Sequence, residues 1–573
     1  MGGVAGGAVR VASVGVGAAS MARDQLVHAV LALWRTQVVL IFTFAMPLLW
    51  LFLLGVLTGN DAVGQDGVRV MQFAAPIAIA MGTFFATLPP VAISVAEARE
   101  TGVLKRLRGT PLPAWGYFFG QIGAALLFAL GSLVVTVLLS VLFYEVRLQT
   151  ETLLATAVTL VVGTTAFSAV GLAIGSLSRS ASIAEAASIG SAVVLSFISG
   201  LFFVGAGLPA WLDTVASVFP LKPYADSLRD QFNPYLPGDG WNPAELAVVG
   251  AWLVAGTLVS LGAFRWERYR SHRVGPTGRR PVRPSPPPDP AGSLSSSLAS
   301  SPSRSSSDGV TSPGLVAVTV RRPSALVLLA GQSVAALRGA ARRPGDVFFS
   351  VVMPVGLFAL LVTVQPGDTL ADGRPAALVI GASMVTWGAG VALFMNLAEG
   401  VARARDTGLL KRMRGTPLPV LGYLAGRTVA GLALTLVILA GILLLGAVAF
   451  GLRIGPAGLL LGLVVLLVGS LSLAACGFLM TTLVPSARAV GTVGLAVLFL
   501  LSFFSDVFLN DGPAWMGTVG SLFPLKHLQN GLAAAWDPAG TPVPWLDVLV
   551  LALWAAAAGA LAVRRFRWEP VTP

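Results

Sequence analysis

The chain has 573 residues, of which 55% are hydrophobic and only 11% are charged, and its formal net charge at pH 7 is +12. Soluble globular proteins carry about 25% charged residues, so this composition excludes a soluble enzyme and predicts an all-α polytopic membrane protein. The single cysteine, Cys476, excludes an intrachain disulfide and a thiolate metal cluster. The three histidines are far apart in the sequence, so we expect neither a metal site nor catalytic residues.

Residues 1–21 are rich in glycine and alanine, and we expect them to form a disordered leader. A cleaved signal peptide is the alternative, but it would export Arg23 and Arg35 against the preference of basic residues for the cytoplasmic side. Residues 22–36 combine apolar residues with basic ends, which predicts a helix at the cytoplasmic membrane surface. Residues 324–343 have the same pattern.

Long apolar segments recur in two sets of six, and a bilayer core needs about 20 apolar residues per helix. The first set lies in a domain predicted over 22–270, near 37–57, 70–94, 115–143, 153–177, 183–204 and 245–264. The second set lies in a domain predicted over 323–573, near 347–364, 376–397, 419–450, 457–483, 489–509 and 545–563. The expected fold is therefore two parallel six-helix transmembrane repeats with twelve membrane helices.

One segment of fourteen residues occurs twice, at a constant shift of 306 positions. It reads ETGVLKRLRGTPLP from Glu100 to Pro113 and DTGLLKRMRGTPLP from Asp406 to Pro419. The copies differ at three positions, each conservatively, although much of the surrounding apolar sequence has drifted. The chain is therefore a fused duplicate, and the preserved segment indicates a working surface.

The repeated segment has the features of a short cytoplasmic helix. Thr101 is expected to cap its first turn, and Gly109 is expected to end it in the left-handed conformation before Pro111. Leu104 and Leu107 are expected to offer a small apolar contact surface, between acidic residues at one end and basic residues at the other. A loop that only had to carry positive charge would not need the preserved threonine, glycine and prolines. The pattern therefore predicts a helix that docks into a partner protein.

The connection over residues 205–244 also repeats, since GLPAW and SVFPLK correspond to GPAW and SLFPLK over 512–526. Its prolines, tryptophans and short apolar stretches predict half-helices that dip into the outer leaflet. Lys222 and Lys526 would then lie near the outer interface. Either these lysines extend to lipid headgroups, or they contact an anionic substrate or lipid during release.

Residues 271–322 are rich in proline, serine and arginine, which predicts a disordered cytoplasmic linker. The net charge from Arg265 to Arg343 is +10, so nearly all of the excess charge lies around this linker. Nucleic-acid binding is disfavoured because the arginines flank apolar segments and have few aromatic neighbours. Basic residues also follow the even-numbered apolar segments in both sets, so the halves are expected to be parallel, with both termini cytoplasmic.

The string from Arg99 to Pro113, with its REtGxLKRlRgTPLP pattern, resembles the coupling segment of type 2 ATP-binding-cassette (ABC) permeases, above all the daunorubicin-resistance-type drug exporters. The six-span halves and the FxSGLFFVGAGLPAW stretch from Phe197 to Trp211 are also similar to that family. Such permeases usually carry one six-span domain per chain and dimerise, so this chain resembles two permease domains joined in tandem. The resemblance implies ATP-driven export across the bacterial plasma membrane.

The same resemblance implies cytosolic ABC ATPase subunits as partners, either two copies or a heterodimer, beside membrane lipids and a small amphiphilic substrate. The four lysines fit no Walker A loop, because none follows glycine or precedes serine or threonine. ATP and Mg are therefore expected on the partner, and no cofactor is expected on this chain. In the first copy the coupling residues are expected to be Glu97, Arg99, Glu100, Thr101, Gly102, Lys105, Arg106, Arg108, Gly109 and Pro111. In the second copy they are Arg405, Asp406, Thr407, Gly408, Lys411, Arg412, Arg414, Gly415 and Pro417.

By resemblance, the translocation path lies between the halves and is lined by the first, second and fifth spans of each. These spans carry almost no charge, which favours an apolar or amphiphilic substrate such as a drug, an antibiotic or a lipid-like compound. The candidate path or release residues are Phe42, Phe197, Phe202, Lys222, Phe349, Phe503, Phe508 and Lys526. A polysaccharide or lipid-linked glycan is the alternative cargo. A secondary transporter and a membrane enzyme are the alternative classes, and they would typically show midplane ionisable residues or a recurring polar catalytic cluster.

Overall fold

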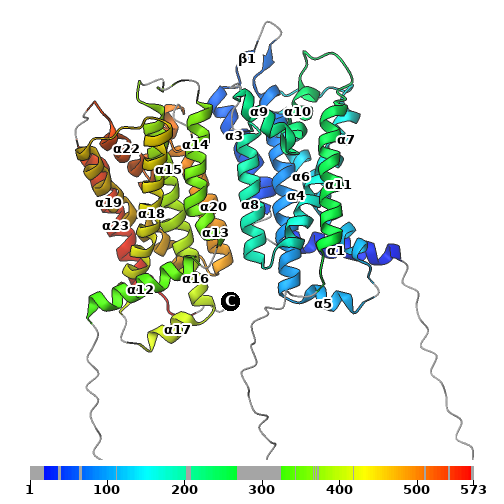
Figure 1. The fold of residues 1–573 in the computed structure, drawn as a ribbon. Helices are drawn as coiled ribbons and strands as arrows, with labels where there is room; N and C mark the ends of the chain where they lie inside the picture. Colours follow the sequence, from blue (N-terminus) through cyan, green and yellow to red (C-terminus); the bar gives the residue numbers. More distant parts are fainter. Residues whose placement is uncertain are drawn as a thin grey trace, which may run out of the picture. The chain divides into compact units, whose positions relative to one another are not determined.

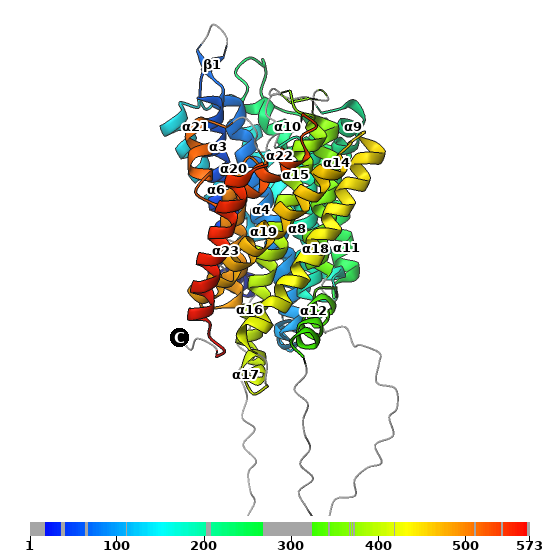
Figure 2. The same ribbon diagram turned by 90° about the vertical axis from the view of Figure 1, so that its left-hand side faces the viewer.

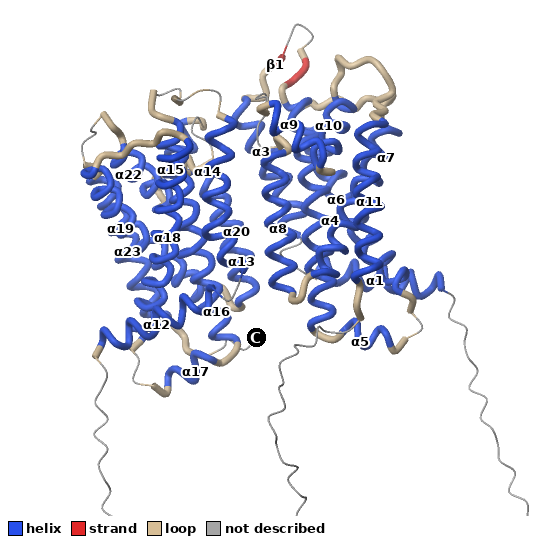
Figure 3. The backbone as a smooth tube through the Cα atoms, viewed as in Figure 1, coloured by secondary structure: helices blue, strands red, loops and turns tan. Residues whose placement is uncertain are grey.

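The computed structural model describes residues 18–266 and 324–569, with gaps at 36–39, 64–66, 111, 202–207, 342–343, 366, 368, 371–372, 417–418, 509–511 and 540–542. The predicted linker over 271–322 lies outside the described residues, as do positions 1–17 of the predicted leader. Nearly every described element is a helix, and the two short strands form a single hairpin (Figure 3).

The first half contains eleven helical elements and one hairpin among its described residues, and Figure 1 labels most of them. Its elements are α1 (Ala18–Trp34), η1 (Ile41–Ala45), α3 (Met46–Thr58), β1 (Ala62–Val63), β2 (Val68–Arg69), α4 (Met71–Glu100), α5 (Val103–Arg108), α6 (Ala114–Tyr144), α7 (Leu153–Leu177), α8 (Ala181–Ile198), α9 (Ala210–Val218), α10 (Leu221–Phe232) and α11 (Pro243–Ala263). The two strands pair antiparallel, with Ala62 opposite Arg69 and Val63 opposite Val68. Within this half, β1, α9 and α10 lie at the end opposite α1 and α5 (Figure 1).

The second half repeats this order of helices. Its described elements are α12 (Ala325–Ala341), α13 (Pro344–Val347), η2 (Phe348–Val352), α14 (Met353–Val364), α15 (Ala376–Ala389), η3 (Gly390–Asn396), α16 (Leu397–Asp406), α17 (Leu409–Arg414), α18 (Val420–Ala449), α19 (Pro456–Leu483), α20 (Ala487–Phe504), α21 (Ala514–Gly520), α22 (Pro524–Trp536) and α23 (Trp545–Arg565). The helix from α15 to α16 is continuous but contains a π-helical turn, and it runs into α17 at one end of this half (Figure 2).

Nine helices in the described part of the chain are long and apolar enough to cross a membrane. They are α4, α6, α7, α8, α11, the continuous helix α15–α16, α18, α19 and α23. The three other predicted spans correspond to shorter apolar helices, Thr43–Val56, Phe348–Val364 and Ala489–Phe504. The all-α polytopic membrane fold is thus confirmed, while the count of twelve spans stays a prediction.

The helix of the second predicted span in each half is the most enclosed of the long helices. In both α4 and the helix over Ala376–Asp406, 89% of the apolar window is buried inside the protein. Helix α7 approaches α4 closely because it carries glycine at the contact: a Cβ added at Gly171 or Gly175 would lie 2.6 Å from a carbonyl oxygen of α4. This close contact holds the end of α4 beside the end of α7, where the repeated segment begins.

Candidate coupling site

The repeated segment forms a two-part turn and helix in both halves. Helix α4 ends at Glu100 and α5 begins at Val103, and the same break separates α16 from α17. Gly102 and Gly408 lie in these breaks with φ of +77° and +70°, a conformation that costs an L-residue about 1–2 kcal/mol. These glycines therefore redirect the chain from the membrane helix into the short helix.

Two details of the predicted capping are wrong. Gly109 does not adopt the left-handed conformation, since its φ is −76°. Thr101 does not cap α5 but ends α4, because its hydroxyl donates a 2.8 Å hydrogen bond to the carbonyl oxygen of Glu97. The left-handed turn therefore precedes the short helix, at Gly102, and does not follow it.

The short helices present their basic side chains to the outside and their leucine to the protein. Lys105, Arg106 and Arg108 are exposed, whereas Leu104 is fully buried beneath them. The second half repeats this arrangement, with Leu410 buried. The expected apolar contact surface is thus corrected, since Leu104 anchors α5 to its own half and leaves a basic outer face. In Figure 1, α5 and α17 each lie beyond the end of the long helix that precedes them.

Arg99, the next-to-last residue of α4, points back into the protein and is only 4% exposed. Its guanidinium donates hydrogen bonds of 2.8 Å to the carbonyl oxygen of Ser178 and 2.9 Å to that of Gly175. These carbonyls belong to the last turn of α7, where backbone oxygens lack helical partners and the helix dipole is negative. Arg99 therefore caps the end of α7 from the end of α4.

Arg405 makes the equivalent contacts in the second half and is also 4% exposed. It donates hydrogen bonds to the carbonyl oxygens of Thr481 at 2.6 Å, Val484 at 3.2 Å and Pro485 at 2.7 Å. These oxygens lie at the end of α19 and in the turn that leads to α20. Both arginines are among the expected coupling residues, and their side chains face the membrane helices of their own half.

The acidic residue after each arginine caps the next helix. The carboxylate of Glu100 accepts a 3.0 Å hydrogen bond from the backbone N–H of Ala181, the first residue of α8. The carboxylate of Asp406 accepts a 2.7 Å hydrogen bond from the N–H of Ala487, the first residue of α20. A negative charge is favourable there because free N–H groups and the positive end of the dipole meet at a helix start.

Arginine and carboxylate together form what we call the Arg–acid clamp, Arg99 with Glu100 and Arg405 with Asp406. Each clamp ties the base of a short basic helix to the end of one membrane helix and the start of the next. In the sequence, the two pairs occupy the same position of the repeat, which indicates a shared role. The sequence does not show that the arginine side chains point into the protein.

The surroundings of the two short helices differ in charge. Glu97 is exposed on the last turn of α4. Its counterpart is Arg403, which is exposed on α16 and forms an ion pair with Glu399 one turn earlier. The first short helix thus has an acidic residue on its flank where the second has a basic one. Pro111 and Pro417 lie outside the described residues.

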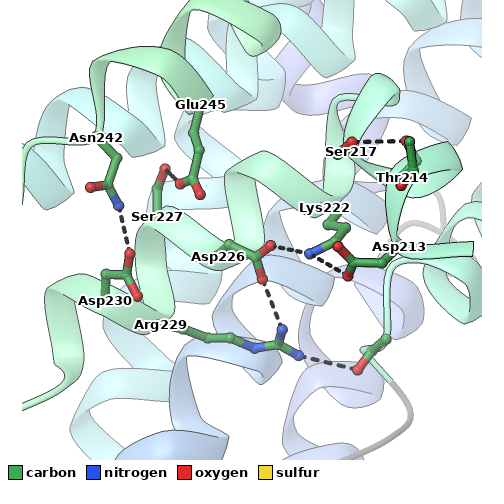
Figure 4. A network of polar contacts seen from close by, with 11 residues as sticks. Asp213, Thr214, Ser217, Lys222, Asp226, Ser227, Arg229, Asp230, Asn242 and Glu245 are labelled. Atoms are coloured by element: carbon green, nitrogen blue, oxygen red, sulfur yellow. Dashed lines mark hydrogen bonds and ion pairs between the residues drawn. The ribbon is translucent and has the colours of Figure 1, made fainter. Parts of the chain in front are cut away.

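The repeated connection contains short helices, as predicted, and its lysines are paired within the protein. The Lys222 ammonium lies 2.5 Å from a carboxylate oxygen of Asp226 and 3.1 Å from one of Asp213, and its side chain is 14% exposed (Figure 4). Arg229 also contacts Asp226, at 2.9 Å, and donates to the carbonyl oxygen of Gly200. Burial opposes the charge of Lys222, but the hydrogen bonds and charges of the two carboxylates outweigh it and raise its pKa.

Lys526 is paired in the same way, with a distance of 2.7 Å to a carboxylate oxygen of Asp506 and a side-chain exposure of 13%. Both lysines therefore brace the connections of their own halves, and the expected contact with headgroups or substrate stays a prediction.

The candidate path phenylalanines divide into three groups. Phe503 and Phe508 lie in an aromatic cluster with Phe499 and Trp387, in which the ring centres are 4.9–6.1 Å apart. Phe197 is 5% exposed, and Phe349 is half-buried against its neighbour Phe348. The side chains of Phe42 and Phe202 are outside the described part of the structure.

Comparison with known proteins accounts for the duplication. The ABC-2 type transporter family matches the chain twice, over residues 26–232 and over residues 328–535. No curated protein matches the sequence. The two family matches cover more than half of the chain and lie one in each half. The chain therefore belongs to the ABC-2 type transporter family, as a multi-pass transmembrane permease component with two family domains in tandem, in a class that normally works with ABC ATPase subunits.

Proposed function

We propose that this chain is the transmembrane permease subunit of an ATP-driven exporter of the bacterial plasma membrane, with twelve spans in two parallel repeats. Separate ATPase subunits bind ATP and Mg, and they dock on α5 and α17. The observation that carries this proposal is the basic helix, present twice, whose outer face is exposed and whose base is held by a buried arginine.

The clamp supplies a route for the motion. A force on α5 acts on the end of α4 through the short Gly102 turn and on the α7–α8 junction through Arg99 and Glu100. The charge-assisted hydrogen bonds make the clamp stiffer than packing alone. Closure of the ATPases therefore moves three membrane helices of one half together, and α17 acts in the same way on α16, α19 and α20.

The different flanks favour unequal docking. The exposed carboxylate of Glu97 lies near α5, and the exposed guanidinium of Arg403 lies near α17. The ATPase surfaces that receive the two short helices therefore meet side chains of opposite charge. Two different ATPase subunits, or two identical ones that engage with different strength, follow from this difference. Exchanging the charges, as in Glu97→Arg with Arg403→Glu, is expected to change ATPase stimulation, and equal activity in both forms would remove the argument for asymmetry.

The cargo is an apolar or amphiphilic compound, such as a drug, an antibiotic or a lipid-like molecule. Support comes from the low charge of the second and fifth predicted spans of each half and from the aromatic cluster around Trp387 and Phe503. An ion route would need ionisable groups along these helices. The subfamily of daunorubicin-resistance-type exporters is part of this proposal.

The test is co-purification with the candidate ATPase followed by transport in vesicles. The triple variant Lys105→Glu, Arg106→Glu, Arg108→Glu reverses the outer face of α5 without touching buried Leu104. We expect it to lose ATPase binding and transport, while Arg453→Glu, an exposed arginine at the other end of the second half, retains both. Transport that survives nucleotide depletion would instead support a secondary transporter.

A further inference from the structure

A single arginine lies inside an apolar membrane helix of the second half. Arg427 is the eighth residue of α18, a helix of 30 residues that is long and apolar enough to span a membrane. At 1.5 Å per residue it lies about 10 Å along the axis from the start of the helix. This depth corresponds to the boundary between headgroups and acyl chains at the end of the half where α17 lies.

The space around Arg427 is shaped by a glycine on the neighbouring helix. A Cβ added at Gly400 of α16 would lie 2.0 Å from Nη2 of Arg427 and 3.3 Å from its Cζ. In the first half the equivalent positions are Ser94 and Gln121, whose side chains share a 3.0 Å hydrogen bond. The second half has thus replaced a neutral, self-satisfied pair by a guanidinium seated over a glycine.

Arg427 has no counter-ion in the described part of the structure. It is half-buried, and no carboxylate or carbonyl of the described residues accepts a hydrogen bond from it. The nearest acidic residue along α16 is Glu399, which is already paired with Arg403. A half-buried guanidinium at the edge of the acyl layer that has no partner in the described residues is stabilised by an anionic group, so its position indicates a ligand.

We propose that Arg427 binds the phosphate of an anionic phospholipid headgroup in the leaflet at the α17 end of the second half. The planar guanidinium presents several N–H donors that match phosphate oxygens, and the apolar surface of α18 accommodates the acyl chains. Gln121 gives the first half no equivalent charge. The lipid site is therefore a property of one half only, and it does not depend on an ATPase.

The test measures lipid binding to the purified full chain by native mass spectrometry. The probes are phosphatidylglycerol, phosphatidylcholine and inorganic phosphate. A charged hydrogen bond of this kind is worth about tenfold in affinity, so Arg427→Gln is expected to weaken phosphatidylglycerol binding about tenfold. Phosphatidylcholine carries the same phosphate, but its choline cation neutralises the headgroup, so its binding is expected to weaken less. The matched control is Arg453→Gln, which removes an exposed arginine at the other end of the second half, away from this leaflet, and is expected to change binding less than twofold.

A second variant protects the test against misfolding. The pair Gly400→Ser with Arg427→Gln rebuilds the hydrogen-bonded pair of the first half, so it retains packing while it removes the charge. The same tenfold loss in both variants supports the site. Unchanged phosphatidylglycerol binding in both overturns it, and displacement of the lipid by inorganic phosphate at equal concentration overturns the assignment to a lipid headgroup.

Discussion

Replacing Arg405 by glutamine removes the guanidinium that binds three carbonyl oxygens at the α19–α20 junction. Arg405 is 4% exposed, so water replaces few of these contacts. Hydrogen bonds to charged groups contribute about 1.5–3 kcal/mol each. Burying a charge costs several kcal/mol, so removing the guanidinium offsets part of that loss. The lost hydrogen bonds outweigh the removed cost of burying the charge, so we expect a net destabilisation of about 3 kcal/mol.

The assay is thermal unfolding of the purified chain in detergent. At about 2 °C per kcal/mol for a large domain, the midpoint of Arg405→Gln is expected to fall by roughly 6 °C. The matched control is Arg414→Gln, because Arg414 lies nine residues further along the chain, has a side chain that is 63% exposed and forms a surface ion pair with Glu569. Such pairs are worth about 0–1 kcal/mol, so the control is expected to shift by less than about 2 °C.

Hydrogen exchange locates the effect of the same variant. The amide of Ala487 donates to Asp406, whose carboxylate lies beside the Arg405 guanidinium, so its protection is expected to fall with the clamp. If Arg405→Gln unfolds at the temperature of Arg414→Gln and the Ala487 amide exchanges as before, the clamp does not hold this junction together.

Three further predictions concern the turn and the outer connection. Gly102→Ala forces an L-residue to φ of +77° with no steric clash, so it is expected to lower the free energy of unfolding by about 1 kcal/mol. The control Gly109→Ala, at φ of −76°, is expected to be neutral. Equal costs in thermal unfolding would refute the assignment of the turn to Gly102. Lys526→Met leaves the half-buried Asp506 carboxylate without its partner and is expected to lower the free energy of unfolding by about 2 kcal/mol. Adding Asp506→Asn in a double-mutant cycle should restore most of this loss, and purely additive effects would contradict the ion pair. The pKa of His527 is raised by the hydrogen bond with Asp547, against the opposing effect of burial, so the stabilisation is present below the unfolded value of about 6.5 and is lost as pH rises through the folded value. The unfolding midpoints of the wild type and His527→Gln are therefore expected to converge as pH rises above about 6.5, and a constant difference would refute the linkage.

The sequence predicted the membrane fold and the duplication because both depend on patterns along the chain. Apolar runs of 20 residues or more need no tertiary information, and the repeat at 306 positions aligns the halves residue by residue. The limits of the short helix were close to those observed, since Gly109 and Gly102 are both glycines near its ends. Which of the two takes positive φ depends on how the chain turns from α4 into α5, which the sequence pattern does not specify.

The direction of polar side chains was the main error of sequence reasoning. Arg99 and Lys105 are both basic residues in one motif, yet Arg99 is buried against α7 and Lys105 is exposed. The difference arises because the ends of α7 and α19 leave carbonyl oxygens that need donors. Likewise, the sequence presents Lys222 and Lys526 as interfacial cations, whereas the structure pairs each of them with a carboxylate of its own half.

The most direct test of the account is cysteine crosslinking between the short helices and the ATPase. Cys476 is the only cysteine of the chain, so a Cys476→Ser background permits single reporters at Lys105 and Lys411, both on the exposed face. With ATP and a bifunctional reagent that joins a thiol to a lysine amine, we expect a covalent adduct of one ATPase subunit with each reporter and none with a cysteine at exposed Arg453. Transport-competent chains that form no adduct at either Lys105 or Lys411 would contradict it.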